Sequence, residues 1–214
     1  MIVGILGGTG KEGAALALRL AKAGYAIIIG SRDEARAATK AAEVAKASGG
    51  NVSGGTNGEA AARGDLVIVA VPFAGHRQLL EELKASLSSK TLIDTVVPLD
   101  FKAAHTYAPP PEGSAAEEAR AVLGAGSRVV AALHQIAAHE LASLDHAIEA
   151  DGFFCGDDAS AKEQAAALIR ALGVRPVDAG GLKNAPILEA MTPLLIEINK
   201  RHKVKSSGIK ITGI

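Results

Sequence analysis

The chain has 214 residues, of which 48% are hydrophobic and 21% are charged, and its formal net charge at pH 7 is zero. This apolar fraction is enough to form a sizeable core and argues against an intrinsically disordered chain. Aromatic residues make up only 3% and tryptophan is absent, so the sequence lacks both the positive field and the stacking side chains typical of nucleic-acid binding. We expect no nucleic-acid partner.

The sequence also restricts the compartment. Cys155 is the single cysteine and cannot form an internal disulfide, which is typical of a reducing compartment. The N-terminal residues lack the basic and long apolar regions of a signal peptide, and no apolar run approaches membrane-spanning length. We expect a cytoplasmic protein without a membrane partner.

Short apolar runs alternate with longer helical patterns along the chain, which is typical of βαβ crossovers. The predicted elements, in chain order, are strands at residues 2–6, 26–30, 66–71, 91–96, 129–133, 153–155 and 175–178, a weaker strand at 52–53, and helices at 11–23, 34–47, 75–86, 115–123, 161–172 and 183–200. Most of the strand runs are continuously hydrophobic, as in a sheet covered on both faces. The sequence therefore predicts an α/β, Rossmann-type, doubly wound and mostly parallel sheet.

Two features bear on domain organisation. Strands continue to residue 178, so we expect the sheet domain over residues 1–180 and a small C-terminal helical segment over 181–214. Residues 98–113 contain four prolines and few candidate core residues. They are either an ordered surface loop near the site or a plain connector.

A glycine-rich turn directly follows the first predicted strand and opens the first predicted helix. Residues 8–13, GTGKEG, fit the pattern G-x-G-x-x-G, and the strand and helix around it supply the context that this pattern requires. We expect Gly8 to permit a tight turn, Gly10 to let a pyrophosphate approach the backbone, and Gly13 to let the helix pack on the strand. The helix N-terminus and the Thr9 hydroxyl would face the phosphates.

The end of the second predicted strand indicates which dinucleotide is bound. An NAD enzyme places a carboxylate there to hold the ribose 2′-hydroxyl, whereas this chain has Ser31 and Arg32. A hydroxyl and a guanidinium suit a 2′-phosphate, which a carboxylate would repel. The pair predicts a preference for NADP(H), although Arg32 could also be an ordinary solvated loop arginine.

Further candidates lie at the ends of later strands. Val71 and Pro72 end the strand predicted at 66–71 and would line the cofactor crevice. His134 follows the strand predicted at 129–133 and is the best placed of the six histidines, although a structural role is almost as plausible. His76 we expect at the surface or in a helix cap. No pattern of metal ligands is present, so we expect no metal.

Several blocks along the whole chain together resemble one family, the NADPH-dependent reductases of coenzyme F420, an 8-hydroxy-5-deazaflavin. The blocks are residues 5–10, 16–21, 29–32, 132–134, 156–158, 178–180 and 192–194. The resemblance implies a Rossmann domain with a small C-terminal part, and a deazaflavin lying beside the nicotinamide of NADP(H). It also implies that Thr9, Ser31 and Arg32 contact NADP(H), and that His134 and Thr192 contact the deazaflavin.

One departure from the family pattern concerns the hydride acceptor. An arginine and a serine are expected ahead of the Thr-Pro pair, where this chain has Pro186 and Ala190. The predicted function is hydride transfer between NADPH and a deazaflavin. The alternatives are an NADPH-dependent reductase of a small carbonyl or imine, with His134 or Lys183 as proton donor, and a non-catalytic NADPH sensor. A homodimer is expected only from the frequency of dimers among soluble proteins.

Overall fold

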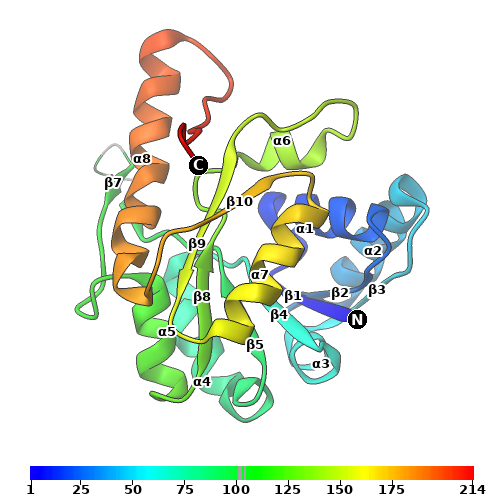
Figure 1. Cartoon of the computed structure of the whole chain (residues 1–214). Helices are drawn as coiled ribbons and strands as arrows, with labels where there is room; N and C mark the ends of the chain where they lie inside the picture. Colours follow the sequence, from blue (N-terminus) through cyan, green and yellow to red (C-terminus); the bar gives the residue numbers. More distant parts are fainter. Residues whose placement is uncertain (101–102, 104) are drawn as a thin grey trace.

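An eight-stranded sheet forms the centre of the computed structural model, which describes residues 1–100, 103 and 105–214 (Figure 1). The strand order is β10-β9-β8-β5-β4-β1-β2-β3, and all neighbours are parallel except the antiparallel pair β8 and β9. The strands are β1 (Ile2–Leu6), β2 (Ala26–Ser31), β3 (Val52–Thr56), β4 (Leu66–Val69), β5 (Thr91–Asp94), β8 (Arg128–Ala132), β9 (Asp151–Gly156) and β10 (Arg175–Asp178). The predicted Rossmann-type sheet is confirmed.

The chain reverses its direction of winding between β1 and β4. β1 pairs with β2 on one side and with β4 on the other, so that Ile5 lies opposite both Ile29 and Ile68. In open α/β sheets the ligand crevice lies at such a switch point, outside the carboxyl ends of the strands. The fold therefore places a crevice at the residues that follow β1, β2 and β4.

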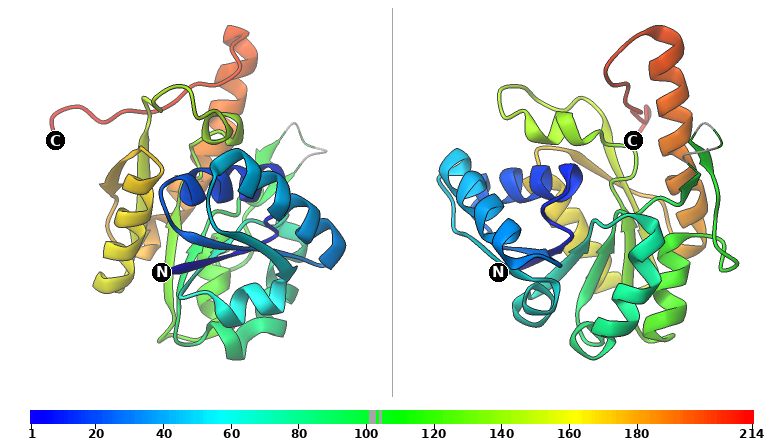
Figure 2. Two further views of the ribbon diagram at one scale, coloured as in Figure 1. Left: turned by 90° about the vertical axis from the view of Figure 1, so that its right-hand side faces the viewer. Right: turned by 180° about the vertical axis from the view of Figure 1, so that it is seen from behind.

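Helices cover both faces of the sheet (Figures 1 and 2). One face carries α1 (Lys11–Lys22), α2 (Glu34–Ser48) and α7 (Ala159–Ala171), and the other carries α3 (Asn57–Arg63), α4 (His76–Leu87) and α5 (Ala115–Leu123). Each layer has its own apolar cluster, because the two faces of every strand contribute alternate side chains. Both faces being buried explains the continuous hydrophobic runs in the sequence.

The C-terminal segment begins inside this core and ends outside it. The short turn η2 (Leu182–Asn184) leads into α8 (Ala185–His202), and Leu182, Ala185 and Leu188 pack into the same cluster as β5 and β8. The second half of α8 projects from the body of the molecule (Figures 1 and 2). Along its length, α8 exposes Ile187 and Leu194, at 59% and 56% of their surface.

The last residues turn back and attach to the strands at the edge of the sheet. The Asp151 amide donates to the carbonyl of Ile209 at 2.9 Å, and the Asp151 carboxylate accepts from the amide of Ile211 at 2.6 Å. The same carboxylate binds the Arg175 guanidinium through two bonds of 2.7 Å. β10 is an edge strand, and it contains Pro176.

Arg19 joins α1 to the segment that follows β8, which contains the short helix α6 (Ala138–Ala142). Its buried guanidinium donates to the carbonyls of Leu141 at 2.8 Å, Leu172 at 3.0 Å and Glu140 at 2.9 Å, and also to that of Ser143. These acceptors replace the water that a buried arginine loses. These bonds hold residues 133–150, called here the post-β8 segment, against the N-terminal half of the fold.

The structure adds elements that were not predicted. They are α3, α6 and the two-residue strands β6 (Leu99–Asp100) and β7 (Thr106–Tyr107), which pair within the proline-containing segment 98–113. Residues 101, 102 and 104 of that predicted loop lie outside the described residues. The strand predicted at 66–71 ends at Val69, so Val71 and Pro72 lie in the loop beyond it.

Candidate functional site

The glycine-rich turn after β1 has the close backbone packing that a phosphate-binding turn requires. Gly8 lies within the tight turn that the Gly10 amide closes on the Gly7 carbonyl at 3.0 Å, and its neighbour Gly7 is the left-handed residue, with φ of 72°. The Gly8 amide donates to the carbonyl of Gly30 at 2.9 Å. A Cβ on Gly13 would lie 2.7 Å from the Cα of Gly8, so a glycine at this position lets the start of α1 pack closely on the turn after β1.

A side chain from another element holds this turn. The Asn57 side-chain oxygen, at the start of α3, accepts from the Gly7 amide at 3.1 Å. Asn57 is buried, and sequence reasoning missed it because its helix was not predicted. In the turn itself Gly10 is exposed and Thr9 is half-buried, so the backbone at the start of α1 faces the crevice.

Ser31 and Arg32 lie at the carboxyl end of β2, beside this turn. Ser31 is buried, and its hydroxyl accepts from the amide of Asp33 at 3.1 Å. Arg32 is exposed and has no hydrogen bond or ion pair to any described residue. Asp33 caps α2 by accepting from the amide of Arg36, so its carboxylate is occupied and Arg32 is the available charge.

Val71 and Pro72 lie against the glycine turn. A Cβ added to Gly7 would meet the Val71 side chain and the carbonyl of Ala70, each at 2.6 Å. Val71 is half-buried and Pro72 is exposed as the residue that precedes the short helix η1 (Phe73–Gly75). The structure thus brings the loop after β4 to the same crevice as the turn after β1.

His134 follows β8 and is buried with only 6% of its surface exposed. Neither ring nitrogen has a hydrogen-bond partner among the described residues. Burial lowers the pKa of His134 to about 4 against a weaker opposing effect of Asp94, so the imidazole is neutral at pH 7. The preceding residue, Leu133, has φ of 68°, a strained conformation for a branched side chain that redirects the chain at the end of the strand.

α8 reaches the same place. The Thr192 hydroxyl donates to the backbone carbonyl of His134 at 2.6 Å, so the structure brings together the two residues that the family resemblance assigned to the acceptor. Pro186 and Ala190 are both half-buried on the same helix. Lys183 is exposed just before it.

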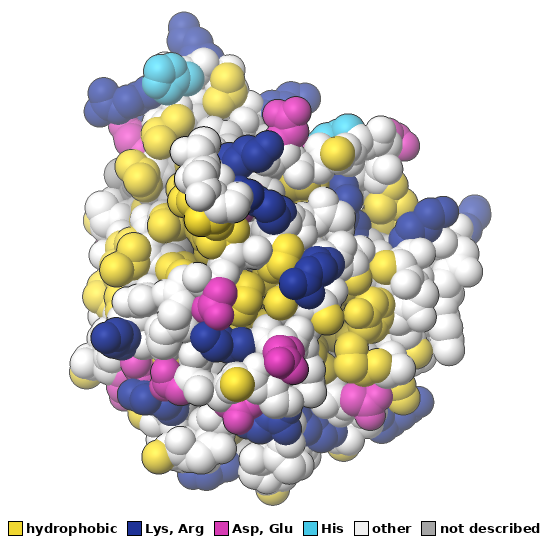
Figure 3. Space-filling model, viewed as in Figure 1, with side chains coloured by type: hydrophobic (Ala, Val, Ile, Leu, Met, Phe, Trp, Pro, Cys, Tyr) yellow, Lys and Arg dark blue, Asp and Glu magenta, His cyan; other side chains and the backbone are white. Residues whose placement is uncertain are grey.

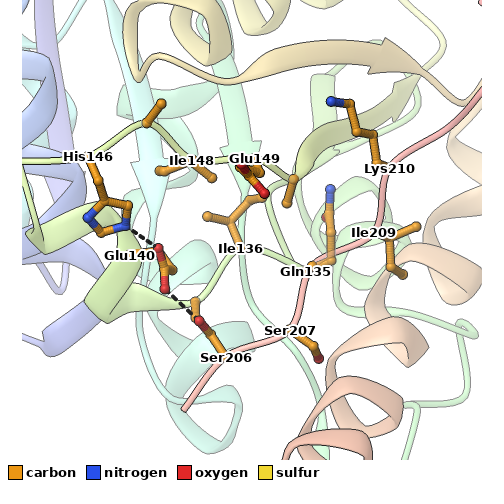
Figure 4. A pocket seen from close by; sticks show the side chains of 14 residues that line it. Gln135, Ile136, Glu140, His146, Ile148, Glu149, Ser206, Ser207, Ile209 and Lys210 are labelled. Atoms are coloured by element: carbon orange, nitrogen blue, oxygen red, sulfur yellow. Dashed lines mark hydrogen bonds and ion pairs between the residues drawn. The ribbon is translucent and has the colours of Figure 1, made fainter. Parts of the chain in front are cut away.

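A cavity of about 660 Å³ lies between the segment that begins at Gln135 and the C-terminal tail (Figure 4). Glu140 joins its two walls, because it accepts from Ser206 at 2.5 Å and lies 2.6 Å from the ring nitrogen of His146. The Gln135 side-chain oxygen and the Ser207 hydroxyl are buried there without a partner among the described residues. These unsatisfied groups are available to a polar ligand.

A buried histidine, His76, lies between two acidic side chains, Asp94 and Glu118. His76 is fully buried, and its two ring nitrogens lie 2.8 Å from Asp94 and 2.8 Å from Glu118. Burial lowers the pKa of His76, but the two carboxylates outweigh it and raise the value to about 9. The expected surface position of His76 was wrong, because its partners come from β5 and α5.

Glu12 is a further residue that sequence reasoning passed over, since it occupies a variable position of the glycine pattern. It is half-buried in the first turn of α1. Burial raises the pKa of its carboxyl group to about 8.

Basic side chains are concentrated at the free end of α8, as the upper part of Figure 3 shows. Lys200, Arg201 and His202 form the last turn of the helix, and Lys210 lies farther on at the cavity.

Within the described residues no cluster of three or more His, Cys, Asp or Glu side chains could hold a metal ion. Among the helices that the structure describes, none is long and apolar enough to cross a membrane.

Comparison with known proteins agrees with this geometry. Residues 2–98 match the family model described as NADP oxidoreductase, coenzyme F420-dependent. The F420-dependent NADP reductase of Methanothermobacter thermautotrophicus is 40% identical over the whole of this chain and 96% of its own length. That of Methanocaldococcus jannaschii is 39% identical over the whole of this chain and 99% of its own length.

A solved structure extends the agreement to three dimensions. The crystal structure of a putative F420-dependent NADP reductase from an Arthrobacter species superposes with a TM-score of 0.85 at 26% identity, over 99% of both chains. Sequence and fold therefore agree over the full length of the chain, including the C-terminal helix. The chain belongs to the family of F420-dependent NADP reductases.

Proposed function

We propose that this chain transfers a hydride between NADPH and coenzyme F420. The observation that carries the proposal is the full-length relationship to F420-dependent NADP reductases at about 40% identity. The crevice supports it, because the glycine turn, the loop after β4, His134 and Thr192 lie along one edge of the sheet. The two cofactors would supply the hydride chemistry themselves, from C4 of the nicotinamide to C5 of the deazaflavin.

The NADP(H) half of the site fits the residues present. Gly8, Thr9, Gly10 and Gly13 would hold the pyrophosphate at the N-terminus of α1, whose first amides have no partner within the helix. Ser31 and the exposed Arg32 would bind the 2′-phosphate through charge-assisted hydrogen bonds. Val71 and Pro72 would form the wall against which the nicotinamide ribose lies.

The acceptor half would be built from His134 and Thr192. His134 is neutral at pH 7, and neither ring nitrogen has a partner among the residues that the structure describes, so it would donate one hydrogen bond to the acceptor ring without adding a charge. Thr192 holds the His134 backbone and would set the orientation of that ring. In this proposal residues 1–180 bind NADP(H), and residues 181–214 complete the acceptor site.

The charges for an anionic acceptor tail would come from the C-terminal segment. Pro186 and Ala190 cannot supply the cation and hydroxyl expected of the family at those positions. Lys210 is exposed at the cavity and would replace the missing cation, whereas Lys183 follows Leu182, which binds Asp157 at the opposite edge of the sheet from His134. The Gln135 oxygen and the Ser207 hydroxyl would supply polar contacts inside the cavity.

NADPH oxidation with a panel of acceptors tests the proposal. We expect rapid oxidation with F420 and little or none with pyrroline-5-carboxylate or small 2-oxoacids. Oxidation by a small imine or carbonyl alone would contradict the deazaflavin assignment. NADPH binding without oxidation by any acceptor would indicate a sensor.

We further propose that the protein is a cytoplasmic homodimer that does not bind nucleic acid. The balanced charge and the single, buried Cys155 support the compartment and the absence of a nucleic-acid partner. The dimer is supported by Ile187 and Leu194, whose exposed side chains lie on one side of α8. Light scattering should give twice the mass of one chain, and Leu194→Asp should halve it; a wild-type monomer would contradict this.

A further inference from the structure

Glu12 is a carboxylic acid in the turn that the proposed function assigns to a diphosphate. It is the second residue of α1, directly after Gly10 and Lys11. Its side chain is half-buried and has no hydrogen bond or ion pair to any residue in the described ranges. An ionised carboxyl group that is partly desolvated and has no hydrogen-bond donor costs free energy, so the environment of Glu12 favours the neutral acid.

The helix fixes the direction in which this side chain points. Glu12 and Arg19 are seven residues apart and therefore lie on the same face of α1. Arg19 donates to the carbonyls of Glu140 and Leu141 in the post-β8 segment. Glu12 is therefore on the face of α1 that packs against the post-β8 segment, two turns nearer to the N-terminus of the helix.

The same residue supplies a phosphate-binding amide. The first helical hydrogen bond of α1 runs from the Ala14 amide to the Gly10 carbonyl at 2.9 Å. The amides of Lys11, Glu12 and Gly13 precede it and are the donors at this N-terminus without a partner among the described residues. Standard bond lengths place a glutamate carboxyl carbon within about 5 Å of its own amide nitrogen. A phosphate that binds the Glu12 amide therefore lies close to the Glu12 carboxyl group.

Other ionisable groups near Glu12 do not set its charge. On the elements packed against α1, these are Arg19 and Lys11 of the helix itself, Glu140 and His139 of α6, and His134 after β8. The buried faces of α2 and α7 toward α1 are lined by apolar side chains such as Ala37, Ala41 and Ala165. Burial raises the pKa of the Glu12 carboxyl group to about 8.

We propose that Glu12 links NADP(H) binding to proton uptake, its carboxyl group becoming protonated from solvent when the diphosphate occupies the turn. A carboxylate and a diphosphate would repel each other in this partly desolvated site, whereas a neutral carboxyl group removes the repulsion and can donate a hydrogen bond. Glu12 then favours the dinucleotide at low pH and opposes it at high pH. The inference rests on the NADP(H) half of the proposed function and not on the identity of the acceptor.

The sign and pH range follow from linkage. Below the pKa of the free protein, Glu12 is already neutral and binding needs no proton. Above about pH 8 each binding event must take up a proton, so affinity falls by up to about tenfold per pH unit until the raised pKa of the complex is reached. The 2′-phosphate does not interfere, because phosphate monoesters are fully ionised well above their second pKa of about 6.

Calorimetric titration with NADP⁺ tests the inference without any turnover. The binding enthalpy is measured at about pH 8.5 in buffers of different ionisation enthalpy, and its slope gives the protons taken up. We expect more than about half a proton per NADP⁺ for the wild-type protein and nearly none for Glu12→Gln. At this pH Glu12→Gln should also bind NADP⁺ more tightly than the wild type.

Glu163→Gln is the matched control, because it makes the same change at an exposed residue of α7, and it should behave as the wild type. His76 has a pKa of about 9 and therefore also titrates near the pH of the measurement. Because all three proteins contain His76, its contribution to proton uptake cancels in the comparison. Equal proton uptake by wild type and Glu12→Gln, or tight binding without uptake, would overturn the inference alone. Failure of the wild type to bind NADP⁺ would overturn the proposed function together with it.

Discussion

Arg32 carries the choice between the two dinucleotides at the scale of single residues. It is exposed beside the crevice and unpaired within the described residues, so it can bind a 2′-phosphate without breaking another contact. Arg32→Asp should weaken NADPH binding by at least about 1.5–3 kcal/mol, the contribution of one hydrogen bond to a charged group. NADH should lose much less affinity. Direct titration with both cofactors measures the difference.

Arg170→Asp is the control for this charge reversal, because Arg170 is exposed on α7 away from the crevice. It should leave both affinities unchanged. Equal losses for NADPH and NADH in Arg32→Asp would remove Arg32 from the specificity argument.

His134 has a different expected signature. If its neutral imidazole orients the acceptor, His134→Ala should lower the rate of hydride transfer while the affinity for NADPH stays nearly constant. His134→Asn keeps a hydrogen-bond donor and should recover part of the rate. Stopped-flow kinetics and NADPH titration separate these quantities. A lower melting temperature combined with normal turnover would instead assign His134 a structural role.

At the scale of elements, the His76 cluster joins α4, β5 and α5 through a buried imidazolium and two carboxylates. Removing one member of a buried ion pair commonly costs about 3–5 kcal/mol, so His76→Gln should lower the free energy of unfolding by roughly this amount. The folded-state pKa of about 9 lies above the ordinary value of 6.5. The stabilisation is therefore complete below pH 6.5 and is lost as the pH rises through 9.

Denaturant unfolding of wild type and His76→Gln across this range measures the effect. The gap between the two proteins should narrow from pH 6.5 to 9. Glu12 and Glu189 also have raised pKa values, of about 8 and 7, but both proteins contain them. A gap that stays constant with pH would show that His76 is not charged in the folded state.

The elements of this fold could be predicted from the sequence where the signal is local. The continuous apolar runs predicted the sheet, and the glycine pattern predicted the turn after β1 because strand, turn and helix are contiguous. Helix α3 was missed, although Thr56 and Glu59 form a capping box, because glycines surround it. The boundary of β4 was placed two residues too late, since hydrophobicity continues beyond the last sheet pairing.

Features that depend on distant partners could not be predicted. His76 is buried because Asp94 and Glu118, 18 and 42 residues away, surround it. Asn57 holds a turn 50 residues earlier, and the neutral state of His134 depends on how completely the fold covers it. Val71 and Pro72 were predicted from a strand end, and Thr192 was predicted from the family resemblance. Glu12 could be recognised only in the structure, because only its burial distinguishes it from an ordinary acidic residue in the first turn of a helix.

At the scale of the whole molecule, charge is neutral overall but unevenly placed. Lys200, Arg201 and Lys203 are exposed at the projecting end of α8, and Lys210 lies at the cavity. If these groups attract the anionic tail of F420, its affinity should fall as salt rises, because exposed charges are screened beyond about 10 Å at 0.1 M. Titration with F420 at low and high ionic strength checks this.

Lys200→Gln combined with Lys203→Gln should flatten the salt dependence, whereas Lys46→Gln at the far end of α2 should not. An absence of F420 binding at low salt, with normal NADPH binding, would show that the family's acceptor does not carry over to this chain.

Pro176 limits how two copies of this molecule can associate. β10 is the outermost strand on its side of the sheet, and a proline there has no amide hydrogen to offer to an added strand. Arg175 and Asp178 place charges at both ends of the same strand, and each is engaged in an ion pair within its own chain. Natural proteins use such features to prevent edge-to-edge association. A sheet continuous across two copies is therefore disfavoured at β10, and a dimer of this protein would have to form through helices such as α8, leaving the strands of each copy separate.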